Sequence, residues 1–182
     1  MNGNSGFTLL ELIVTLAVAA IIVTVGIPSF QAMIERIRLS GKTDDLVSAI
    51  MLTRSEAIKR GMRVTLCKAD TRQADPMCAP DSVEGYEQGW IVFADSANPG
   101  VRDPGELLIQ VSEPDRNLGI RITSTATAFN RYISFAADGL PKLIDGGFQA
   151  GTMTLCKATK AQHVIMSRFG RIRTVRNATC SG

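Results

Sequence analysis

The sequence predicts an α+β protein in which a long N-terminal helix packs on a domain of antiparallel strands. Three observations support this prediction: an apolar segment of membrane length at residues 7–27, helical spacing of apolar residues over 28–61, and short β-rich runs over 62–182. The 182 residues, of which 45% are hydrophobic, suffice for one membrane segment and one compact domain. We therefore expect no second globular domain.

The first element is the apolar segment 7–27, whose roughly 21 residues would form about 30 Å of helix, the thickness of a bilayer's hydrocarbon core. It contains one carboxylate, Glu11. A charge inside a membrane span costs about 2.5–3.5 kcal/mol, so an intramembrane carboxylate normally has a partner and a role. A secretory signal peptide is the alternative. Residues 1–6 hold no Lys or Arg, however, and no small-x-small cleavage site follows the apolar segment.

The second element continues the helix over residues 28–61, with its apolar side chains on one face. They recur at Phe30, Ile34, Ile37, Leu46 or Val47, Ile50, Ala57 and Ile58. Lys59 and Arg60 followed by Gly61 are typical of a helix C-terminus. Residues 7–60 would then form one helix about 80 Å long, with a transmembrane half and an amphipathic half.

Short runs of β-formers follow, separated by Gly, Pro, Asn and Asp. They predict strands at 64–69, 90–94, 107–111, 120–124, 132–136, 153–157 and 163–168. Asp138-Gly139 predicts a hairpin that joins the strand before it to residues 140–144, and residues 159–162 are expected to form the next turn. An antiparallel sheet that packs on the outer half of the helix accounts for this order of elements.

Four cysteines lie beyond the apolar segment, at Cys67, Cys78, Cys156 and Cys180, and none forms a C-x-x-C pair. This spacing gives little support to a metal site. An even number of cysteines in an exported domain favours disulfides. Of the three pairings we expect the one between sequence neighbours, Cys67 with Cys78 and Cys156 with Cys180. The domain would then occupy an oxidising compartment.

Charge is distributed unevenly along the chain, although the net charge of +3 is too small to indicate a partner. Acidic residues outnumber basic ones over residues 70–115, whereas the C-terminal segment carries cations and no acid. These cations are Lys157, Lys160, Arg168, Arg171, Arg173 and Arg176. The segment is a candidate anion-binding surface, and a solvated basic strand is the alternative.

Within that segment Arg171 and Arg173 would share one face of an extended chain, about 6.5 Å apart, a distance comparable with the spacing of successive phosphates. Lys157, Lys160, Arg168 and Arg176 would widen the surface, and binding would be independent of sequence and sensitive to salt. Only one aromatic residue, Phe169, lies near these cations in the sequence. Contact with a duplex backbone is therefore expected rather than base stacking.

At the N-terminus, Gly6 before Phe7, then Glu11, the apolar span and Pro28 together resemble the type IV pilin superfamily. The resemblance implies the pilin fold, cleavage after Gly6 by a prepilin peptidase and methylation of the Phe7 amine. Residues 1–6 would be the leader, although leaders in this family usually carry Lys or Arg and this one carries none. Glu11 would then pair with the Phe7 amine of a neighbouring subunit and set the stagger between subunits during assembly.

Later segments narrow the resemblance. The run 89–95, Asn98 and the run 105–108 are similar to the FimT and GspH group of minor pilins and pseudopilins, and the similarity covers nearly the whole chain. The run Gly170-Arg171-Ile172-Arg173 is similar to the GRxR element of FimT-type minor pilins, whose members bind DNA for uptake in natural transformation.

The resemblance implies a single-pass protein of the bacterial inner membrane, with its C-terminal domain in the periplasm. It would join a type IV pilus through its N-terminal helix and bind double-stranded DNA through Gly170, Arg171 and Arg173. The alternative is a GspH-type pseudopilin of a type II secretion system, with the same N-terminal assembly chemistry.

Other polar and aromatic residues are interpreted structurally. Trp90, which alternates with Val92, is expected in the core, and His163 is expected to be a hydrogen-bonded strand residue. Asp95, Asn98 and Asp103 lack the spacing of an EF-hand and are interpreted as turn residues rather than a calcium site. Catalytic motifs such as G-x-S-x-G and H-E-x-x-H are missing from the sequence. We therefore expect no enzymatic activity, no metal and no cofactor.

Overall fold

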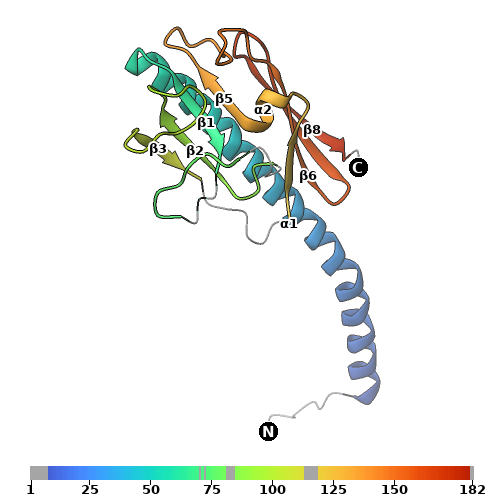
Figure 1. Ribbon diagram of the computed structural model, residues 1–182. Coiled ribbons are helices and arrows are strands. Elements are labelled where there is room, and N and C mark those ends of the chain that lie inside the picture. The colour runs from blue at the N-terminus through green and yellow to red at the C-terminus, as the bar shows by residue number, and fades with distance from the viewer. Residues whose placement is uncertain (1–7, 70, 72, 81–84, 113–118, 181–182) are drawn as a thin grey trace. The chain divides into compact units, whose positions relative to one another are not determined.

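The computed structural model describes residues 8–69, 71, 73–80, 85–112 and 119–180 (Figure 1). The chain divides into two units, residues 1–37 and residues 38–182, and each is described by itself. The predicted leader 1–6, with its cleavage site at Gly6 and the amine of Phe7, lies outside the described residues.

Helix α1 spans Leu9–Arg60. Thr8 caps its N-terminus, because the Thr8 hydroxyl oxygen accepts the Glu11 N–H at 3.2 Å. The sequence pattern placed this start two residues earlier, at residue 7. At the other end, the N–H groups of Gly61 and Met62 donate to the carbonyls of Ile58 and Ala57, both at 3.3 Å. Gly61 has φ +64, so this end is a Schellman motif, and the predicted C-terminus is confirmed.

In the first unit, most of the described apolar side chains of α1 up to residue 37 are exposed. Among the residues that the structure describes, α1 is the one helix long and apolar enough to cross a membrane. An 18-residue window within it has a mean hydropathy of 2.6, and none of that window is buried. By length and composition, this segment fits the membrane span predicted from the sequence.

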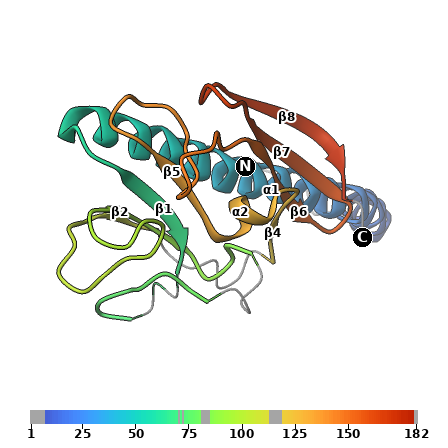
Figure 2. The same cartoon turned by 45° about the horizontal axis from the view of Figure 1, so that its top comes forward.

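The second unit contains two four-stranded antiparallel sheets within the described residues (Figure 1, Figure 2). The first has the order β3-β2-β1-β5, with β1 Val64–Lys68, β2 Trp90–Ala94, β3 Leu108–Val111 and β5 Tyr132–Phe135. The second has the order β4-β6-β7-β8, with β4 Arg121–Ser124, β6 Gly151–Lys157, β7 Lys160–Met166 and β8 Ile172–Thr179. A short helix, α2 Thr127–Arg131, precedes β5.

One hydrophobic core joins the C-terminal half of α1 to both sheets. The helix contributes Leu39, Leu46, Ala49, Ile50 and Ala57. In this unit the prediction of a buried face is confirmed for Leu46, Ile50 and Ala57, but it is wrong for Ile58, which is 54% exposed. The first sheet contributes Val64, Leu66, Trp90, Val92, Ile133 and Phe135, and the second contributes Ile122, Met153, Leu155, Val164 and Met166. The prediction that Trp90 and Val92 belong to the core is confirmed.

The C-terminal strands differ from the prediction. The expected strand 163–168 is β7, which runs from residue 160 to 166, and the basic segment after it forms β8. The expected turn at residues 159–162 lies at Ala158 and Thr159, because Lys157 already pairs with Lys160. The turn is displaced because Ala161 and Gln162 are buried. Buried backbone N–H and C=O groups need hydrogen-bond partners, and pairing within β7 supplies them.

The hairpin predicted at Asp138-Gly139 is only partly present. The turn forms, since the Gly139 N–H donates to the Ala136 carbonyl at 2.9 Å and Gly139 has φ +73. The returning chain, however, makes a single bridge between Phe135 and Pro141 rather than a strand over residues 140–144. Pro141 has no N–H to donate to a strand ladder, which limits pairing at this point.

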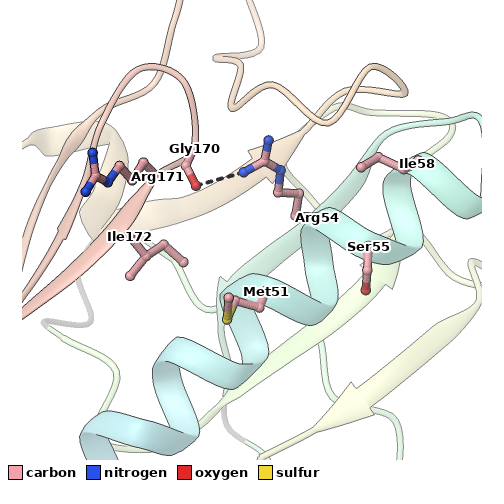
Figure 3. Close-up of a pocket in the computed structure, with 7 residues that line it drawn as sticks. All are labelled: Met51, Arg54, Ser55, Ile58, Gly170, Arg171 and Ile172. Atoms are coloured by element: carbon pink, nitrogen blue, oxygen red, sulfur yellow. Dashed lines mark hydrogen bonds between the residues drawn. The ribbon is translucent and has the colours of Figure 1, made fainter.

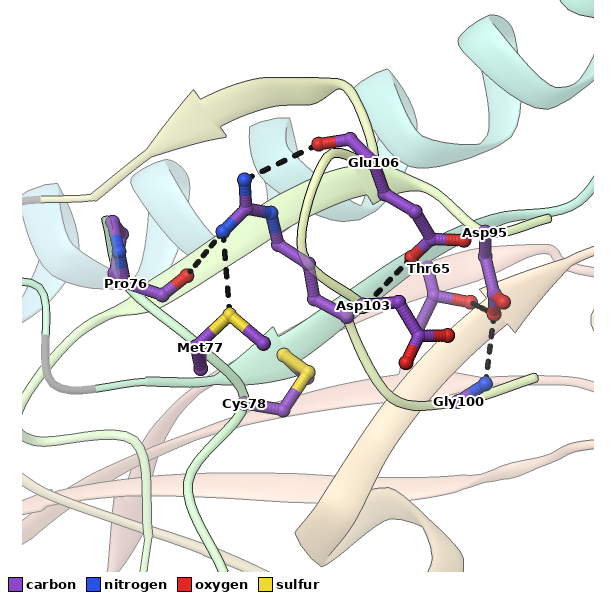
Figure 4. Close-up of a disulfide and its surroundings, with 10 residues drawn as sticks. Thr65, Pro76, Met77, Cys78, Asp95, Gly100, Asp103 and Glu106 are labelled. Atoms are coloured by element: carbon purple, nitrogen blue, oxygen red, sulfur yellow. Dashed lines mark hydrogen bonds between the residues drawn. A yellow bond between two sulfur atoms is a disulfide. The ribbon is translucent and has the colours of Figure 1, made fainter. Parts of the chain in front are cut away.

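Two disulfides are present. Cys67 in β1 bonds to Cys78, and Cys156 at the end of β6 bonds to Cys180 just after β8. Near the first disulfide, the guanidinium of Arg102 donates to the carbonyls of Pro76 at 3.1 Å and Glu106 at 3.2 Å (Figure 4). Arg102 is only 5% exposed, so it ties the segment around Cys78 to the loop between β2 and β3.

That β2–β3 loop is organised by its own polar side chains. Asp95 accepts the hydroxyl of Thr65 at 2.5 Å and the N–H of Gly100 at 2.8 Å, and the Asn98 amide donates to Asp103. The described residues contain no group of three His, Cys, Asp or Glu side chains placed to hold a metal ion. The hydrogen bonds of Asp95, Asn98 and Asp103 hold the backbone of this loop.

Glu106 closes the same loop. Its carboxylate accepts the N–H groups of Ser96 at 2.7 Å, Ala97 at 3.0 Å and Asp103 at 3.0 Å. Burial acts to raise the pKa of Glu106, but these backbone donors outweigh it and hold the pKa below its ordinary value of 4.5.

We expect a Glu106→Gln variant to lose less stability in acid than the wild type does. The pKa of Glu106 is lower in the folded chain than in the unfolded chain, so the ionised carboxylate stabilises the fold at any pH above the unfolded pKa. This stabilisation is lost as the pH falls through the lowered pKa of the folded chain. The single tryptophan, Trp90, is buried, so its fluorescence reports the unfolding of the second unit. Wild-type Tm should fall more steeply than variant Tm between about pH 5 and pH 3. Parallel pH profiles would contradict this role of Glu106.

Candidate nucleic-acid interface

The β7–β8 hairpin carries the predicted GRxR element in its loop. The Gly170 N–H donates to the Ser167 carbonyl at 2.8 Å, and the Ser167 N–H donates to the Arg171 carbonyl at 3.0 Å. Gly170 follows this turn with φ +75, which is the pattern of a three-residue hairpin loop with glycine in the left-handed position. The loop therefore has a defined shape, set by hydrogen bonds at its two ends.

Gly170 is also held against helix α1. Its carbonyl oxygen accepts a hydrogen bond of 3.0 Å from the Arg54 guanidinium (Figure 3). A Cβ atom on Gly170 would lie 3.1 Å from Arg54 Nη1 and 3.2 Å from the Phe135 ring. Both the backbone conformation and the close packing therefore require glycine here. Arg54 positions the hairpin, and no signal in the sequence pointed to it.

Arg171 and Arg173 lie on either side of Ile172, which packs against the core. Both arginines are exposed, as expected for alternate residues of an extended segment. Within the part of the chain that the structure describes, neither guanidinium has an ion-pair or hydrogen-bond partner. In Figure 3 the Arg171 side chain extends away from Arg54. The two guanidiniums are available to an external anion.

The other predicted cations do not all join this surface. Arg168 lies in the same loop, but Arg176 forms an ion pair of 3.4 Å with Asp44 of α1. Lys157 and Lys160 lie at the opposite end of β7, because the antiparallel register pairs residue 160 with residue 179 and residue 166 with residue 172. The length of β7 separates them by about 20 Å from the loop. Lys157 and Lys160 therefore lie apart from the hairpin loop, and Arg176 already has a partner, so a contribution of these three residues to DNA binding stays a prediction.

Two phenylalanines lie beside the hairpin loop, where the sequence indicated only one. The rings of Phe148 and Phe169 have centroids 6.5 Å apart in an edge-to-face arrangement, and they are 50% and 59% exposed. Lys142 Nζ lies 4.1 Å from the centre of the Phe148 ring, and Arg168 Cζ lies 5.2 Å from that of Phe169. Because Phe148 comes from a separate loop, no local pattern could place it near Phe169.

A hollow of about 440 Å³ adjoins the same loop on the helix side (Figure 3). Its lining residues are Met51, Arg54, Ser55, Ile58, Gly170, Arg171 and Ile172. The Arg54 bond to Gly170 crosses between the helix and the hairpin at this place. Arg171 therefore stands between a mostly apolar recess and solvent.

The family of the chain is decided by comparison with known proteins. Residues 42–170 match the family described as Type II transport protein GspH, and residues 1–27 match the prokaryotic N-terminal methylation motif. The first match covers well over half of the chain. The chain belongs to the GspH family of the type IV pilin superfamily. No curated protein sequence matches this GspH-family chain.

Solved structures confirm the predicted pilin fold for this GspH-family chain. One crystal structure of the type IV minor pilin FimU from Pseudomonas aeruginosa matches with a TM-score of 0.58 and 15% identity, over 80% of this chain and 95% of that one. A second FimU crystal form matches with a TM-score of 0.54 and 13% identity, over 78% and 96%. At these identities the likeness shows the fold alone.

The GspH match ends at Gly170, so Arg171 and Arg173 lie just beyond it. The matched region therefore includes β7 and the loop as far as Gly170, but neither of the two arginines nor strand β8. His163, on the neighbouring strand, accepts or donates a 2.9 Å hydrogen bond with Thr154, which confirms it as a hydrogen-bonded strand residue.

Glu11 of the GspH-family chain lies in the first turn of α1, where its side chain is exposed. Its backbone N–H donates to the Thr8 hydroxyl oxygen at 3.2 Å. Since Phe7 lies outside the described residues, the pairing of Glu11 with a neighbouring subunit's Phe7 amine stays a prediction.

Proposed function

We propose that the chain is a minor pilin of FimT type, which joins a type IV pilus and binds DNA for uptake in natural transformation. Prepilin peptidase cleaves after Gly6 and methylates Phe7. The first part of α1 anchors the chain in the inner membrane, with the second unit in the periplasm, and then packs against other pilins in the fibre. The observation that supports the DNA-binding part is the pair of exposed arginines, Arg171 and Arg173, on the β7–β8 hairpin, whose guanidiniums have no partner among the described residues.

The geometry of this pair suits a phosphate backbone. Residues two apart on an extended segment lie about 6.5 Å from one another, so each guanidinium can reach one of two successive phosphates. Arginine binds phosphate through two parallel N–H groups, and such contacts carry no base information. Gly170, Arg54 and the strand ladder of β8 hold the backbone in place, which reduces the entropy lost on binding.

The test is the salt dependence of duplex binding by the full chain in a non-ionic detergent. Each phosphate contact contributes about −0.9 to the slope of log K against log[salt] for duplex DNA. Arg171→Gln combined with Arg173→Gln should weaken binding uniformly across sequences and lower the magnitude of that slope by about 2. Equal affinities and slopes in the two proteins would refute the site.

Lys157→Gln combined with Lys160→Gln is the matched control, because it removes the same charge from the opposite end of β7. A general loss of positive charge would weaken binding in both double variants alike. A site at the hairpin loop requires the control to keep the wild-type slope.

The second candidate is a minor pseudopilin of a type II secretion system, and it is favoured by the description of the matched family. Such a protein would use the same Glu11-dependent assembly but would have no need of a DNA site. Deletion of the gene distinguishes the two functions: loss of transformation with intact enzyme export supports the pilus, and the reverse result supports the secretion pseudopilus.

A further inference from the structure

We define the aromatic tip as Phe148, Phe169, Lys142 and Arg168, and its two rings are 50% and 59% exposed. Both rings contribute apolar surface that the fold leaves half in solvent, although the same chain buries Phe93, Phe129 and Phe135 almost completely. Each ring is instead accompanied by one cation. Exposed apolar surface that is rimmed by charge usually marks a binding site.

Both rings are held by well-ordered local structure. Phe169 occupies the loop closed by the Ser167 hydrogen bonds. Phe148 precedes Gln149, whose side chain is 1% exposed and bonds to the N–H of Ser134 and the carbonyl of Tyr132. The Lys142 N–H donates to the Ser134 carbonyl at 3.0 Å, so the neighbouring cation is anchored as well. The tip is therefore formed before any ligand arrives.

In an intact DNA duplex the faces of the bases are stacked on one another, so the rings could reach them only by unstacking a base step, which costs a few kcal/mol. An unpaired base exposes a π-face that stacks on aromatic rings or on guanidinium planes, and this contact is sequence-tolerant. The aromatic tip provides both surfaces, two residues along the chain from Arg171. The cations of the same loop would hold the phosphates on either side of a stacked base.

We propose that the aromatic tip stacks unpaired nucleobases, so that the hairpin binds single-stranded DNA and single-stranded ends as well as the duplex backbone. This inference rests on the proposed DNA-binding function and specifies its ligand further. It replaces the sequence-based expectation that base stacking plays no part, which depended on Phe169 being the one aromatic residue close to the cations.

The experiment measures binding of the full chain in non-ionic detergent to three labelled probes: oligothymidine, an abasic oligonucleotide of equal length, and a capped duplex whose two ends are each closed by an oligoethylene glycol linker. The abasic probe has the phosphates without the bases, and the capped duplex has no unpaired bases. Phe148→Ala with Phe169→Ala removes the rings and keeps every charge. Leu107→Ala with Val111→Ala is the matched control, since both side chains are exposed and belong to or adjoin β3.

Wild-type protein should prefer oligothymidine to the abasic probe, and the double phenylalanine variant should lose this preference. A loss of about 5- to 100-fold for oligothymidine corresponds to stacking of one base. Affinity for the abasic probe and the capped duplex should not change, and the Leu107 and Val111 control should bind all three probes as the wild type does. Phe148→Tyr with Phe169→Tyr retains the rings and should restore the preference.

The outcomes separate this inference from the proposed function. If no probe binds, both fall. If the capped duplex binds in a manner that depends on Arg171 and Arg173, while oligothymidine binding is insensitive to the phenylalanines, the stacking inference alone is overturned. An equal loss for all three probes would overturn it too, because the rings would then act on the fold or on general electrostatics rather than on bases.

Discussion

A Glu11→Ala variant is expected to be expressed and inserted normally but to be absent from assembled filaments. The carboxylate stands within the apolar segment, where an unpaired charge costs about 2.5–3.5 kcal/mol. A neighbouring subunit's Phe7 amine, freed by leader cleavage, would supply its partner. Without that pair the subunits lose both an attraction in low dielectric and the contact that sets their stagger. Immunoblots of sheared filaments against whole cells measure the effect, for which we expect a loss of at least about tenfold.

Glu35→Gln is the matched control for this variant, because it removes one carboxylate from the same helix beyond the predicted membrane segment. It should enter filaments as the wild type does. Undiminished incorporation of the Glu11→Ala chain would contradict the assembly role. An untrimmed N-terminus in the mass spectrum of the native protein would do the same, since the amine partner would then not exist.

Replacement of Gly170 by alanine should both destabilise the second unit and weaken DNA binding, although it removes no charge. A side chain at φ +75 costs about 1–2 kcal/mol, and the new Cβ would crowd the Arg54 guanidinium and the Phe135 ring at 3.1 and 3.2 Å. Overpacking of this kind adds about 1–3 kcal/mol. We expect a total loss of about 2–5 kcal/mol in the free energy of unfolding, measured by Trp90 fluorescence in urea.

Gly146→Ala separates the two terms. Gly146 also has a positive φ, of +88, but a Cβ there would meet nothing within 4 Å. Its cost should be the backbone term alone, and its DNA binding should be that of the wild type. Equal destabilisation by the two substitutions would mean that the Arg54 contact does not hold the hairpin in position.

Local signals in the sequence were sufficient for the elements whose boundaries depend on adjacent residues. Gly61 ends α1 because a glycine in the left-handed conformation caps the helix there, and β2 has the predicted bounds of Trp90–Ala94. The predicted strands did not include β8, although the segment around Arg171 and Arg173 was expected to be extended. Its exposed cations and its polar residues conceal the alternation, and its pairing with β7 supplies the order that its own composition does not.

The candidate site depended on information that no local pattern contains. The separation of Lys157 and Lys160 from Arg171 follows from the register between β7 and β8. The approach of Phe148 to Phe169 brings together two loops distant in sequence, and the Arg54 bond to Gly170 spans 116 residues. The sequence alone could identify a basic C-terminal segment. It could not show that the lysines of this segment lie at one end of β7 and Arg171 at the other.

The anchoring of β8 at both of its ends has a mechanical consequence. One end continues through the hairpin loop that Arg54 fastens to the helix, and the other is joined to β6 by the bond between Cys156 and Cys180. A force applied along β8 through a ligand bound at the loop would act on all the hydrogen bonds between β7 and β8 together, in shear. It would not break them one after another from a free end. The strand that presents the arginines is thereby suited to resist a pulling force.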